Sequence, residues 1–302
     1  MPAPVLTITL NPAVDKTVKG ARAKLSAGGK GINVSRALKA LGVGSVATGF
    51  AGGDTGKFIR SALKKERIES RFMEIRGSTR TNLTYIRPGG KAARRIEKGP
   101  VISAAEFRQF KKIFTGLLRG RKYAVFSGAN ANGLPASAYR ELISIAKKNG
   151  VKAVLDTRDA ALKEGLKAKP DIVKPNVDEA QYIYGKRPVS VIGIKAALKC
   201  FRAKGAGTAL LTLGASGAAA SDGKHAIFVR PPKVRAANDV GCGDAFLAGF
   251  IAYRLKGKDL GESVRAASAA GTASAAGLVP GSFNKKDFLW IYSGTTTNSE
   301  TL

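Results

Sequence analysis

The chain has 302 residues, of which 44% are hydrophobic and 24% charged, a composition that excludes a disordered or fibrous protein and suffices for a substantial core. Its formal net charge is +30, from 51 Lys and Arg against 21 Asp and Glu, which predicts attraction to anions from phosphorylated metabolites to nucleic acid. The basic residues are scattered along the chain and form no single tail. This favours solvated helix faces and generic polyanion attraction over a dedicated nucleic-acid partner.

Strand-like and helix-like segments alternate along the chain without a linker, which predicts one domain over residues 1–302. In chain order we expect a strand over 5–10, a helix over 32–41, an alternating strand over 81–86, a strand over 124–126, a helix over 138–148, strands over 151–155 and 171–173, a helix from about 178, a strand over 209–213 and a helix over 244–255. Apolar strands alternating with helices predict an α/β fold: a mostly parallel sheet covered by helices on both faces, with ligands at the carboxyl ends of its strands. The polar end, 293–302, predicts a frayed tail.

The cysteine content and the absence of targeting features indicate a cytoplasmic protein. No segment has the unbroken apolar length of a membrane span, and the first four residues lack the basic and apolar regions of a signal peptide. The two cysteines, Cys200 and Cys242, are too few for a disulfide framework. With His225 as the single histidine, neither a zinc site nor a histidine mechanism is expected.

The segment from Asn238 to Asp244 is the most informative part of the sequence. Gly241 and Gly243 flank Cys242, so the backbone can turn tightly and direct its N–H groups toward an anion at the start of a helix. The helix dipole is expected to keep the carboxylate of Asp244 ionised, so that it can accept a proton from a hydroxyl attacking a phosphate. The alternative is a plain glycine turn into a buried helix.

Three candidate substrate groups lie in the first third of the chain. The glycine cluster from Gly28 to Asn33 brings backbone N–H groups, the ammonium of Lys30 and an amide toward a negatively charged substrate. Asp15 follows the first strand and either binds sugar hydroxyls or caps a turn. Arg80 precedes the alternating strand and either reaches a phosphate or is merely solvated.

Two further motifs lie in the later half. Asn176 and Glu179 are three residues apart at a predicted helix start, which suits direct or water-mediated contacts to Mg²⁺ but is equally typical of a capping box. The segment from Gly214 to Gly217 leaves a buried strand and either gives room for a nucleotide or forms a simple hairpin turn.

The motifs occur in a specific order: 9–17, 27–36, Arg80-Thr81-Asn82, Lys98-Gly99-Pro100, Lys174-Pro175-Asn176 and Gly241-Cys242-Gly243-Asp244. In this order they resemble the phosphofructokinase-B branch of the ribokinase-like sugar kinases, which includes 1-phosphofructokinase and tagatose-6-phosphate kinase. The resemblance implies a kinase domain with a small β lid near 16–27 and 78–98. It also implies the use of ATP and Mg²⁺ to phosphorylate a ketohexose phosphate, with fructose 1-phosphate first and tagatose 6-phosphate or fructose 6-phosphate as alternatives.

The same resemblance implies a role for each matching residue. Asp244 is the expected base, and the amides of Gly241, Cys242 and Gly243 are the expected anion hole. The residues expected to hold the sugar phosphate are Asp15, Gly29, Lys30, Asn33 and Arg80. Those expected to serve the nucleotide are Lys174, Asn176, Thr212, Gly214 and Gly217, with Asn176 and Glu179 as Mg²⁺ contacts, directly or through water.

The sequence departs from the family pattern at three places. Only residues 16–27 separate Asp15 from the glycine cluster, so the lid is predicted to be shortened, which leaves the substrate identity and a homodimer open. Ala129 stands where the family commonly has a hydroxyl, and Arg158 where a small residue is usual. Two other functions stay open: a ribokinase or nucleoside kinase acting on an unphosphorylated substrate, and a non-catalytic polyanion-binding protein on a kinase fold.

Overall fold

The computed structural model of the chain describes residues 3–86, 92–236, 240–277 and 279–302. In chain order the strands are β1 Val5–Thr9, β2 Ala13–Lys19, β3 Arg22–Gly28, β4 Ser45–Ala51, β5 Glu69–Glu74, β6 Arg80–Ile86, β7 Ala92–Arg95, β8 Tyr123–Ser127, β9 Lys152–Asp156, β10 Ile172–Val173, β11 Thr208–Thr212, β12 Ala218–Ser221, β13 His225–Arg230 and β14 Thr296–Thr301. The helices are α1 Lys30–Ala40, α2 Gly53–Lys65, α3 Ala104–Leu117, α4 Ala138–Lys148, α5 Asp159–Leu166, α6 Val177–Tyr184, α7 Val191–Ala203, α8 Cys242–Leu255, α9 Leu260–Ala276 and α10 Lys285–Gly294, and Gly214–Ser216 forms a 3-10 turn.

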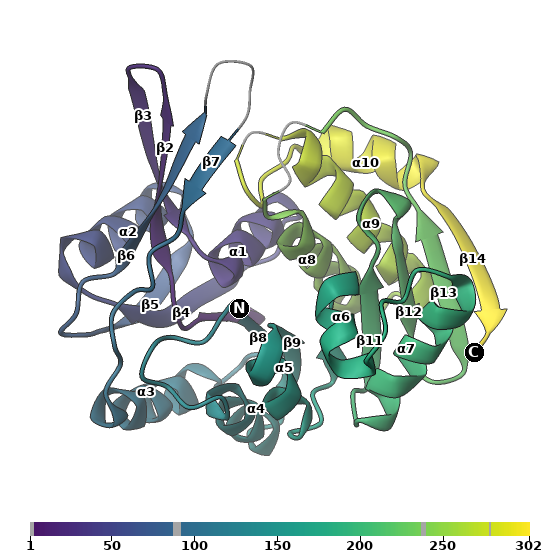
Figure 1. Cartoon of the computed structure of the whole chain (residues 1–302), viewed down its shortest axis with the longest axis horizontal. Helices are drawn as coiled ribbons and strands as arrows, with labels where there is room; N and C mark the ends of the chain where they lie inside the picture. Colours follow the sequence, from purple (N-terminus) through teal and green to yellow (C-terminus); the bar gives the residue numbers. More distant parts are fainter. Residues whose placement is uncertain (1–2, 87–91, 237–239, 278) are drawn as a thin grey trace.

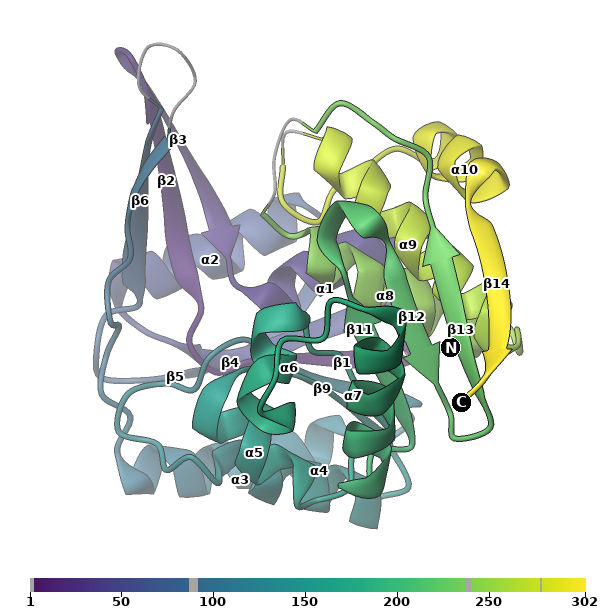
Figure 2. The same ribbon diagram turned by 45° about the vertical axis from the view of Figure 1, so that its right-hand side comes forward.

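The main sheet has ten strands in the order β14-β13-β12-β11-β10-β9-β8-β1-β4-β5 (Figure 1). In this order, neighbouring strands pair in parallel from β5 across to β11. Strands β11, β12, β13 and β14 form an antiparallel meander at the other edge. Helices α3 to α7 lie on one face, whereas α1, α8 and α9 lie on the other (Figures 1 and 2). Because both faces are covered, β1 and β8 are buried along their whole length, as continuous apolar strands require. The predicted α/β fold class is confirmed.

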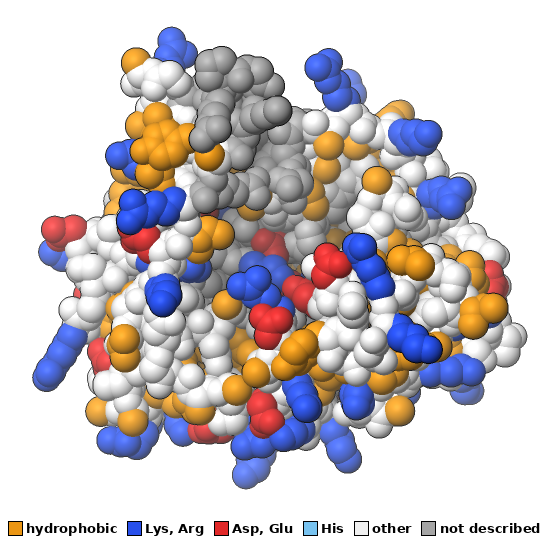
Figure 3. All heavy atoms as spheres, viewed as in Figure 1, with side chains coloured by type: hydrophobic (Ala, Val, Ile, Leu, Met, Phe, Trp, Pro, Cys, Tyr) orange, Lys and Arg blue, Asp and Glu red, His pale blue; other side chains and the backbone are white. Residues whose placement is uncertain are grey.

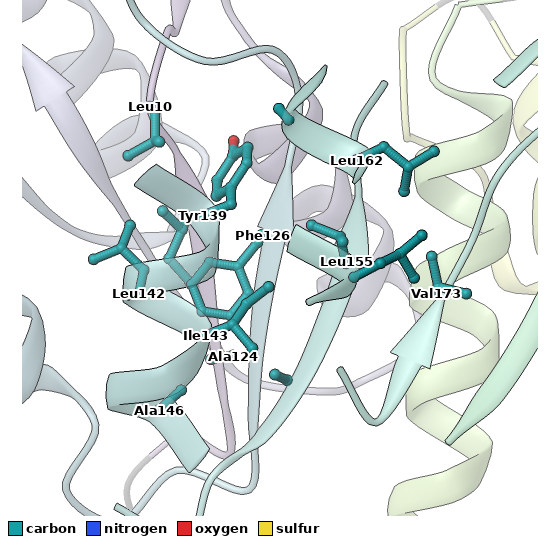
Figure 4. Close-up of a cluster of buried hydrophobic side chains, with 14 of the residues drawn as sticks. Leu10, Ala124, Phe126, Tyr139, Leu142, Ile143, Ala146, Leu155, Leu162 and Val173 are labelled. Atoms are coloured by element: carbon teal, nitrogen blue, oxygen red, sulfur yellow. The ribbon is translucent and has the colours of Figure 1, made fainter. Parts of the chain in front are cut away.

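Two large hydrophobic clusters hold the helices on the two faces of this sheet. Successive residues of β8 alternate between them: Phe126 belongs to one cluster and Val125 to the other. Phe126 packs with Tyr139 of α4 at a ring-centroid distance of 6.0 Å, and Leu155 of β9 and Leu162 of α5 are buried in the same cluster (Figure 4). The α4–α5 layer therefore positions the carboxyl ends of β8 and β9.

A second sheet of four strands, in the order β3-β2-β6-β7, stands away from the main sheet (Figures 1 and 2). We call it the lid sheet. Strands β2 and β3 form an antiparallel hairpin, and β2 pairs in parallel with β6. The alternating segment 81–86 therefore lies in a separate β element, as predicted, and the segments 16–27 and 78–98 both contribute strands to it outside residues 87–91.

The prediction of a frayed tail over 293–302 is wrong. Residues Thr296–Thr301 form β14, which pairs in antiparallel register with β13 over six residue pairs. Lys195 of α7 adds an ion pair to Glu300 at 2.8 Å. The tail is polar because β14 is an exposed edge strand, and its β-branched threonines suit that conformation. Over the described ranges, no helix has both the length and the apolar character that a membrane crossing needs.

Helix α8, which carries Asp244, packs closely against α9. A Cβ atom added at Gly249 of α8 would lie 2.6 Å from the carbonyl oxygen of Ala266 and 2.9 Å from the Cα of Ala267. Two helix backbones approach this closely only where one of them carries no side chain. Gly116 of α3 differs, because a Cβ atom there would meet no atom within 4 Å.

We expect Gly249→Ala to lower the free energy of unfolding by about 1–3 kcal/mol, because the added methyl group forces the two helices apart. Gly116→Ala is the matched control and is expected to raise stability by about 0.5–1 kcal/mol, since alanine favours a helix interior. Urea unfolding followed by circular dichroism measures both. Equal effects of the two substitutions would contradict the close packing of α8 on α9.

Candidate active site

The start of α8 forms a tight left-handed turn. Gly241, the N-cap, has φ 83°, and the backbone N–H groups of Asp244 and Ala245 both donate to its carbonyl oxygen, at 3.1 and 2.9 Å. A Cβ atom at Gly241 would lie 2.6 Å from the backbone nitrogen of Gly281, so glycine is required for space as well as for conformation. Gly241, Cys242 and Gly243 thus provide the N-cap and first turn of a helix, an arrangement that favours anions. Residues 238 and 239 of the predicted motif lie outside the described residues.

Asp244 is almost completely buried at this helix start, with 3% of its surface exposed. Its Oδ2 atom accepts a hydrogen bond from Nδ2 of Asn33 at 2.9 Å, whereas its Oδ1 atom has no hydrogen-bond partner in the described part of the chain. Burial raises the pKa of Asp244 to about 6, against the lowering effects of Lys30, Asn33 and Lys174. The pKa shift is therefore opposite in direction to the one that the helix dipole predicts, although a carboxyl with this pKa is still largely ionised at pH 7.

Asn33 is held between the carboxylate of Asp244 and the guanidinium of Arg36. Nη1 of Arg36 donates to Oδ1 of Asn33 at 3.0 Å, and Nδ2 of Asn33 donates to Asp244. Because a guanidinium can only donate, it fixes the amide with its oxygen toward Arg36 and its NH₂ group toward Asp244. The predicted substrate residue Asn33 is therefore a direct hydrogen-bond partner of the predicted base, Asp244.

A second buried carboxylate, Asp156, anchors two lysines beside Asp244. Its Oδ1 atom lies 2.9 Å from Nζ of Lys30 and 3.2 Å from Nζ of Lys174, and none of the Asp156 side chain is exposed. Although burial alone would raise the pKa of Asp156, Lys174 and Lys30 hold it below its usual value. Oδ2 of Asp156 has no hydrogen-bond partner within the described ranges. Sequence reasoning missed Asp156, whose one signal is an acidic residue directly after an apolar parallel strand.

The charged groups around Asp156 converge on the start of α8. A Cβ atom added at Gly243 would lie 3.4 Å from Nζ of Lys174, so this ammonium lies next to the first turn of the helix. Lys30 lies 3.9 Å from Oε1 of Glu179, and the surrounding carboxylates of Asp156, Asp244 and Glu179 raise its pKa despite the opposing effect of burial. Figure 3 shows acidic and basic side chains together at the centre of this face. The structure thus brings together the predicted residues Lys30, Asn33, Lys174, Glu179 and Asp244.

The carboxylate of Asp15, on β2 of the lid sheet, lies against the backbone of Gly28 at the end of β3. A Cβ atom at Gly28 would lie 2.1 Å from Oδ2 of Asp15, so the carboxylate occupies the space that a side chain would need. Nδ2 of Asn82 donates to Oδ1 of Asp15 at 2.9 Å. Burial raises the pKa of Asp15, while Asn82, Arg36 and Arg80 oppose this shift. Gly29, with φ 131°, follows Gly28 in the chain and is the N-cap of α1, whose first residue is Lys30.

Arg80 fastens the lid sheet to the end of β1. Its guanidinium donates to three backbone carbonyl oxygens, those of Asn11, Pro12 and Glu97, at 3.0, 3.4 and 2.9 Å. Since a guanidinium has five N–H donors, these contacts leave capacity for an anion. Arg80 therefore has a structural role at the base of the lid sheet, and its contact with a phosphate stays a prediction.

The predicted nucleotide residues follow β10 and β11. Asn176 and Glu179 form a reciprocal capping box on α6: the N–H of Glu179 donates to Asn176 at 2.8 Å, and the N–H of Asn176 donates to Glu179 at 2.9 Å. Asn176 also pairs with Thr212 in a parallel bridge. Gly214 and Gly217, with φ 62° and 99°, form the turn of the β11–β12 hairpin. The capping box and the hairpin turn, each an alternative interpretation from sequence, are thus both present in the structure.

Comparison with known proteins extends over almost the whole chain. The profile of the pfkB family carbohydrate kinases matches residues 5–279. The chain is 32% identical over 302 residues to tagatose-6-phosphate kinase of Staphylococcus epidermidis, covering 95% of this chain and 97% of that protein. It is 33% identical over 282 residues to 1-phosphofructokinase of Bacillus subtilis, covering 90% and 92%. A crystal structure of phosphofructokinase-2 from Escherichia coli in complex with fructose-6-phosphate superposes with a TM-score of 0.89 at 27% identity, covering 96% of this chain and 98% of that one.

The parallel sheet with its separate lid sheet therefore has the ribokinase-like fold of small-molecule kinases. Within that class, the chain belongs to the pfkB family of carbohydrate kinases. It is accordingly an ATP-dependent kinase, as the sequence motifs predict.

The hydrogen bond from Asn33 predicts how activity depends on pH. A base with a pKa of about 6 loses its function as the pH falls through that value, so kcat/KM is expected to decline on the acid side near pH 6. Asn33 lowers the pKa of Asp244, so Asn33→Ala is expected to move the acid limb upward by about one pH unit. Asn149→Ala, at an exposed Asn on the end of α4, is the control. An unchanged acid limb in Asn33→Ala would exclude Asp244 as the titrating group.

Proposed function

We propose that the protein transfers the γ-phosphoryl group of ATP to a hydroxyl of a ketohexose phosphate, with fructose 1-phosphate as the first candidate substrate. The observation that carries this proposal is the buried Oδ1 atom of Asp244 at the glycine-flanked start of α8, which has no hydrogen-bond partner among the described residues. A buried carboxylate oxygen without a hydrogen bond is costly unless a donor arrives, and the hydroxyl of an acceptor sugar is such a donor.

In this proposal Asp244 accepts the proton of the attacking hydroxyl while the phosphoryl group moves in line from ATP to the sugar oxygen. A pKa of about 6 keeps the carboxylate ready to accept that proton at neutral pH. The amides of Gly241, Cys242 and Gly243, at the start of α8, stabilise the charge on the transferring group. Lys30 and Lys174, both fixed on Asp156, add positive charge beside the transferring group.

The acceptor lies under the lid sheet in this proposal. Asp15, oriented by Asn82, accepts hydrogen bonds from sugar hydroxyls, and Gly29 lets the backbone approach the sugar. The remaining donors of Arg80 bind the phosphate of the sugar. A phosphorylated acceptor is supported by relatives named tagatose-6-phosphate kinase and 1-phosphofructokinase and by the fructose-6-phosphate in a structural neighbour. We also place the reaction in the cytoplasm, where ATP is available and thiols stay reduced.

The residues next to Lys30 fit a magnesium ion that accompanies ATP. Asp156 and Glu179 offer carboxylate oxygens, which Mg²⁺ prefers, and the buried Oδ2 of Asp156 lacks a hydrogen bond within the described residues. Asn176 retains a second lone pair on the side-chain oxygen that caps α6. Within the described ranges, no group of three or more His, Cys, Asp or Glu side chains is placed to hold a metal ion by itself. When bound, Mg²⁺ supplies charge neutralisation between the phosphates.

We expect Asp244→Asn to lower kcat by about 10²- to 10⁴-fold, because it removes the proton acceptor without emptying the phosphate pocket. Nucleotide affinity, measured by calorimetry, is expected to remain within about threefold of the parent, and thermal stability is expected to be retained because a buried charge is removed. Asp54→Asn, at a carboxylate that is 95% exposed, is the control. Full turnover in Asp244→Asn would refute the proposed role.

The substrate is identified by coupled ADP release with fructose 1-phosphate, tagatose 6-phosphate, fructose 6-phosphate, ribose and a nucleoside. We expect a hexose phosphate to give the highest kcat/KM, because Arg80 then has a phosphate to bind. Arg80→Lys is expected to raise KM for that substrate, since lysine does not reproduce the fork of a guanidinium. Highest kcat/KM with ribose or the nucleoside would favour the unphosphorylated-substrate alternative.

A further inference from the structure

A groove of about 670 Å³ lies outside the site described above, between β3, α1, α2 and the loop 279–282. Figure 1 shows β3 of the lid sheet rising beside α2 and α1. Its charged lining consists of four cationic side chains, Lys24, Arg36, Lys39 and Lys65, against the single carboxylate of Glu66. The groove is therefore strongly electropositive.

The rest of the lining is largely apolar and includes Leu25, Phe58, Ala62 and Ile68. Leu25, on β3, is 48% exposed, so the groove presents apolar side-chain surface to a ligand. A cavity with apolar walls and several cations at its rim suits a small molecule that combines a phosphate group with an apolar body. We propose that this groove is a second binding site, for a phosphate-bearing small molecule, and that its occupation alters the hydrogen bond between Asn33 and Asp244.

The cations of the groove differ in how their charge is compensated. Arg36, with 7% of its side chain exposed, is paired with Glu66 through two hydrogen bonds of 2.6 and 2.8 Å. Lys39 donates to the backbone carbonyl oxygen of Glu66. Lys24 and Lys65 are exposed and have no ion pair among the described residues. These two lysines are therefore available to an anion at little cost in existing contacts.

Arg36 connects the groove to the predicted base through a chain of two hydrogen bonds. Its guanidinium donates to Oδ1 of Asn33, and Nδ2 of Asn33 donates to Asp244. A phosphate in the groove competes with Glu66 for the guanidinium, because both are anions with matching geometry. Any displacement of Arg36 changes the orientation of the Asn33 amide and therefore the hydrogen bond that lowers the pKa of Asp244.

The loop 279–282 provides a second physical connection. Val279 and Ser282 line the groove. Gly281, between them, lies against the backbone of Asn33 and of Gly241 in the site described above. A Cβ atom added at Gly281 would lie 2.5 Å from the carbonyl oxygen of Asn33, and one added at Gly241 would lie 2.6 Å from the backbone nitrogen of Gly281. A ligand that shifts this loop thus acts directly on the N-cap of α8.

The test uses phenyl phosphate as the probe, with phenol and inorganic phosphate as its two halves. Binding to the full-length protein is measured by calorimetry in the presence of Mg²⁺ and saturating AMP-PNP, so that the nucleotide phosphates occupy the start of α8. We expect the Lys24→Gln/Lys65→Gln double variant to bind phenyl phosphate about tenfold more weakly than the parent. Lys64→Gln is the matched control, because Lys64 is an exposed neighbour on α2 that does not line the groove, and its affinity is expected to be unchanged.

Two outcomes would overturn the second site: no saturable binding of phenyl phosphate to the parent, or the same affinity in the parent, the double variant and the control. The binding experiment requires no turnover, so it stands independently of the proposed kinase substrate. The coupling to Asp244 is tested by kcat at saturating ATP and acceptor. We expect phenyl phosphate to change kcat of the parent and of Lys64→Gln but not of the double variant, and an unchanged kcat of the parent would refute the coupling.

Discussion

The buried carboxylate of Asp156 is the constraint around which the site is arranged. Its side chain is fully removed from water, so an ionised state requires cations in direct contact. Lys30, at the start of α1, and Lys174, which follows β10, both reach the same Oδ1 atom. This shared contact ties the start of α1 to the carboxyl ends of β9 and β10 in the main sheet. Removing either lysine would leave the buried Asp156 carboxylate with one compensating cation. Asp156 thus holds both ammonium groups in place together.

Asp244 lies close to this cluster but has a different electrostatic balance. Asp156 has two ammonium groups in contact, which lower its pKa, whereas Asp244 has one neutral amide from Asn33, and burial raises its pKa to about 6. Two neighbouring carboxylates whose pKa values are pushed in opposite directions suit different tasks. One keeps a permanent negative charge that orders lysines, and the other is poised to take up and release a proton at neutral pH. The environment, and not the residue type, separates the two tasks.

The sequence predicts those parts of the molecule in which local pattern and tertiary packing agree. The apolar residues of 138–148 recur on one face, which predicts a helix with the boundaries of α4. Helix α9 was missed, since Ala, Ser and Gly fill most of its buried positions and leave no apolar stripe. The glycines around Cys242 reveal the start of α8, but Asp156 owes its role to Lys30, 126 residues away. Its pairing with Lys174 likewise depends on β9 and β10 lying side by side, which single-sequence patterns do not encode.

The functional effect of the net charge of +30 depends on where the individual cations lie. Most Lys and Arg side chains in Figure 3 lie around the edges of that face, where water and salt screen them. Lys30 and Lys174 differ because they are packed against Asp156, and Arg36 differs because it is buried between Glu66 and Asn33. Because the guanidinium of Arg36 cannot turn without breaking several hydrogen bonds at once, a displacement of Glu66 also changes the contact of Arg36 with Asn33. Arg36 is therefore distinguished by its position and not by its charge. It lies between an open groove and the Asn33 amide that donates to Asp244.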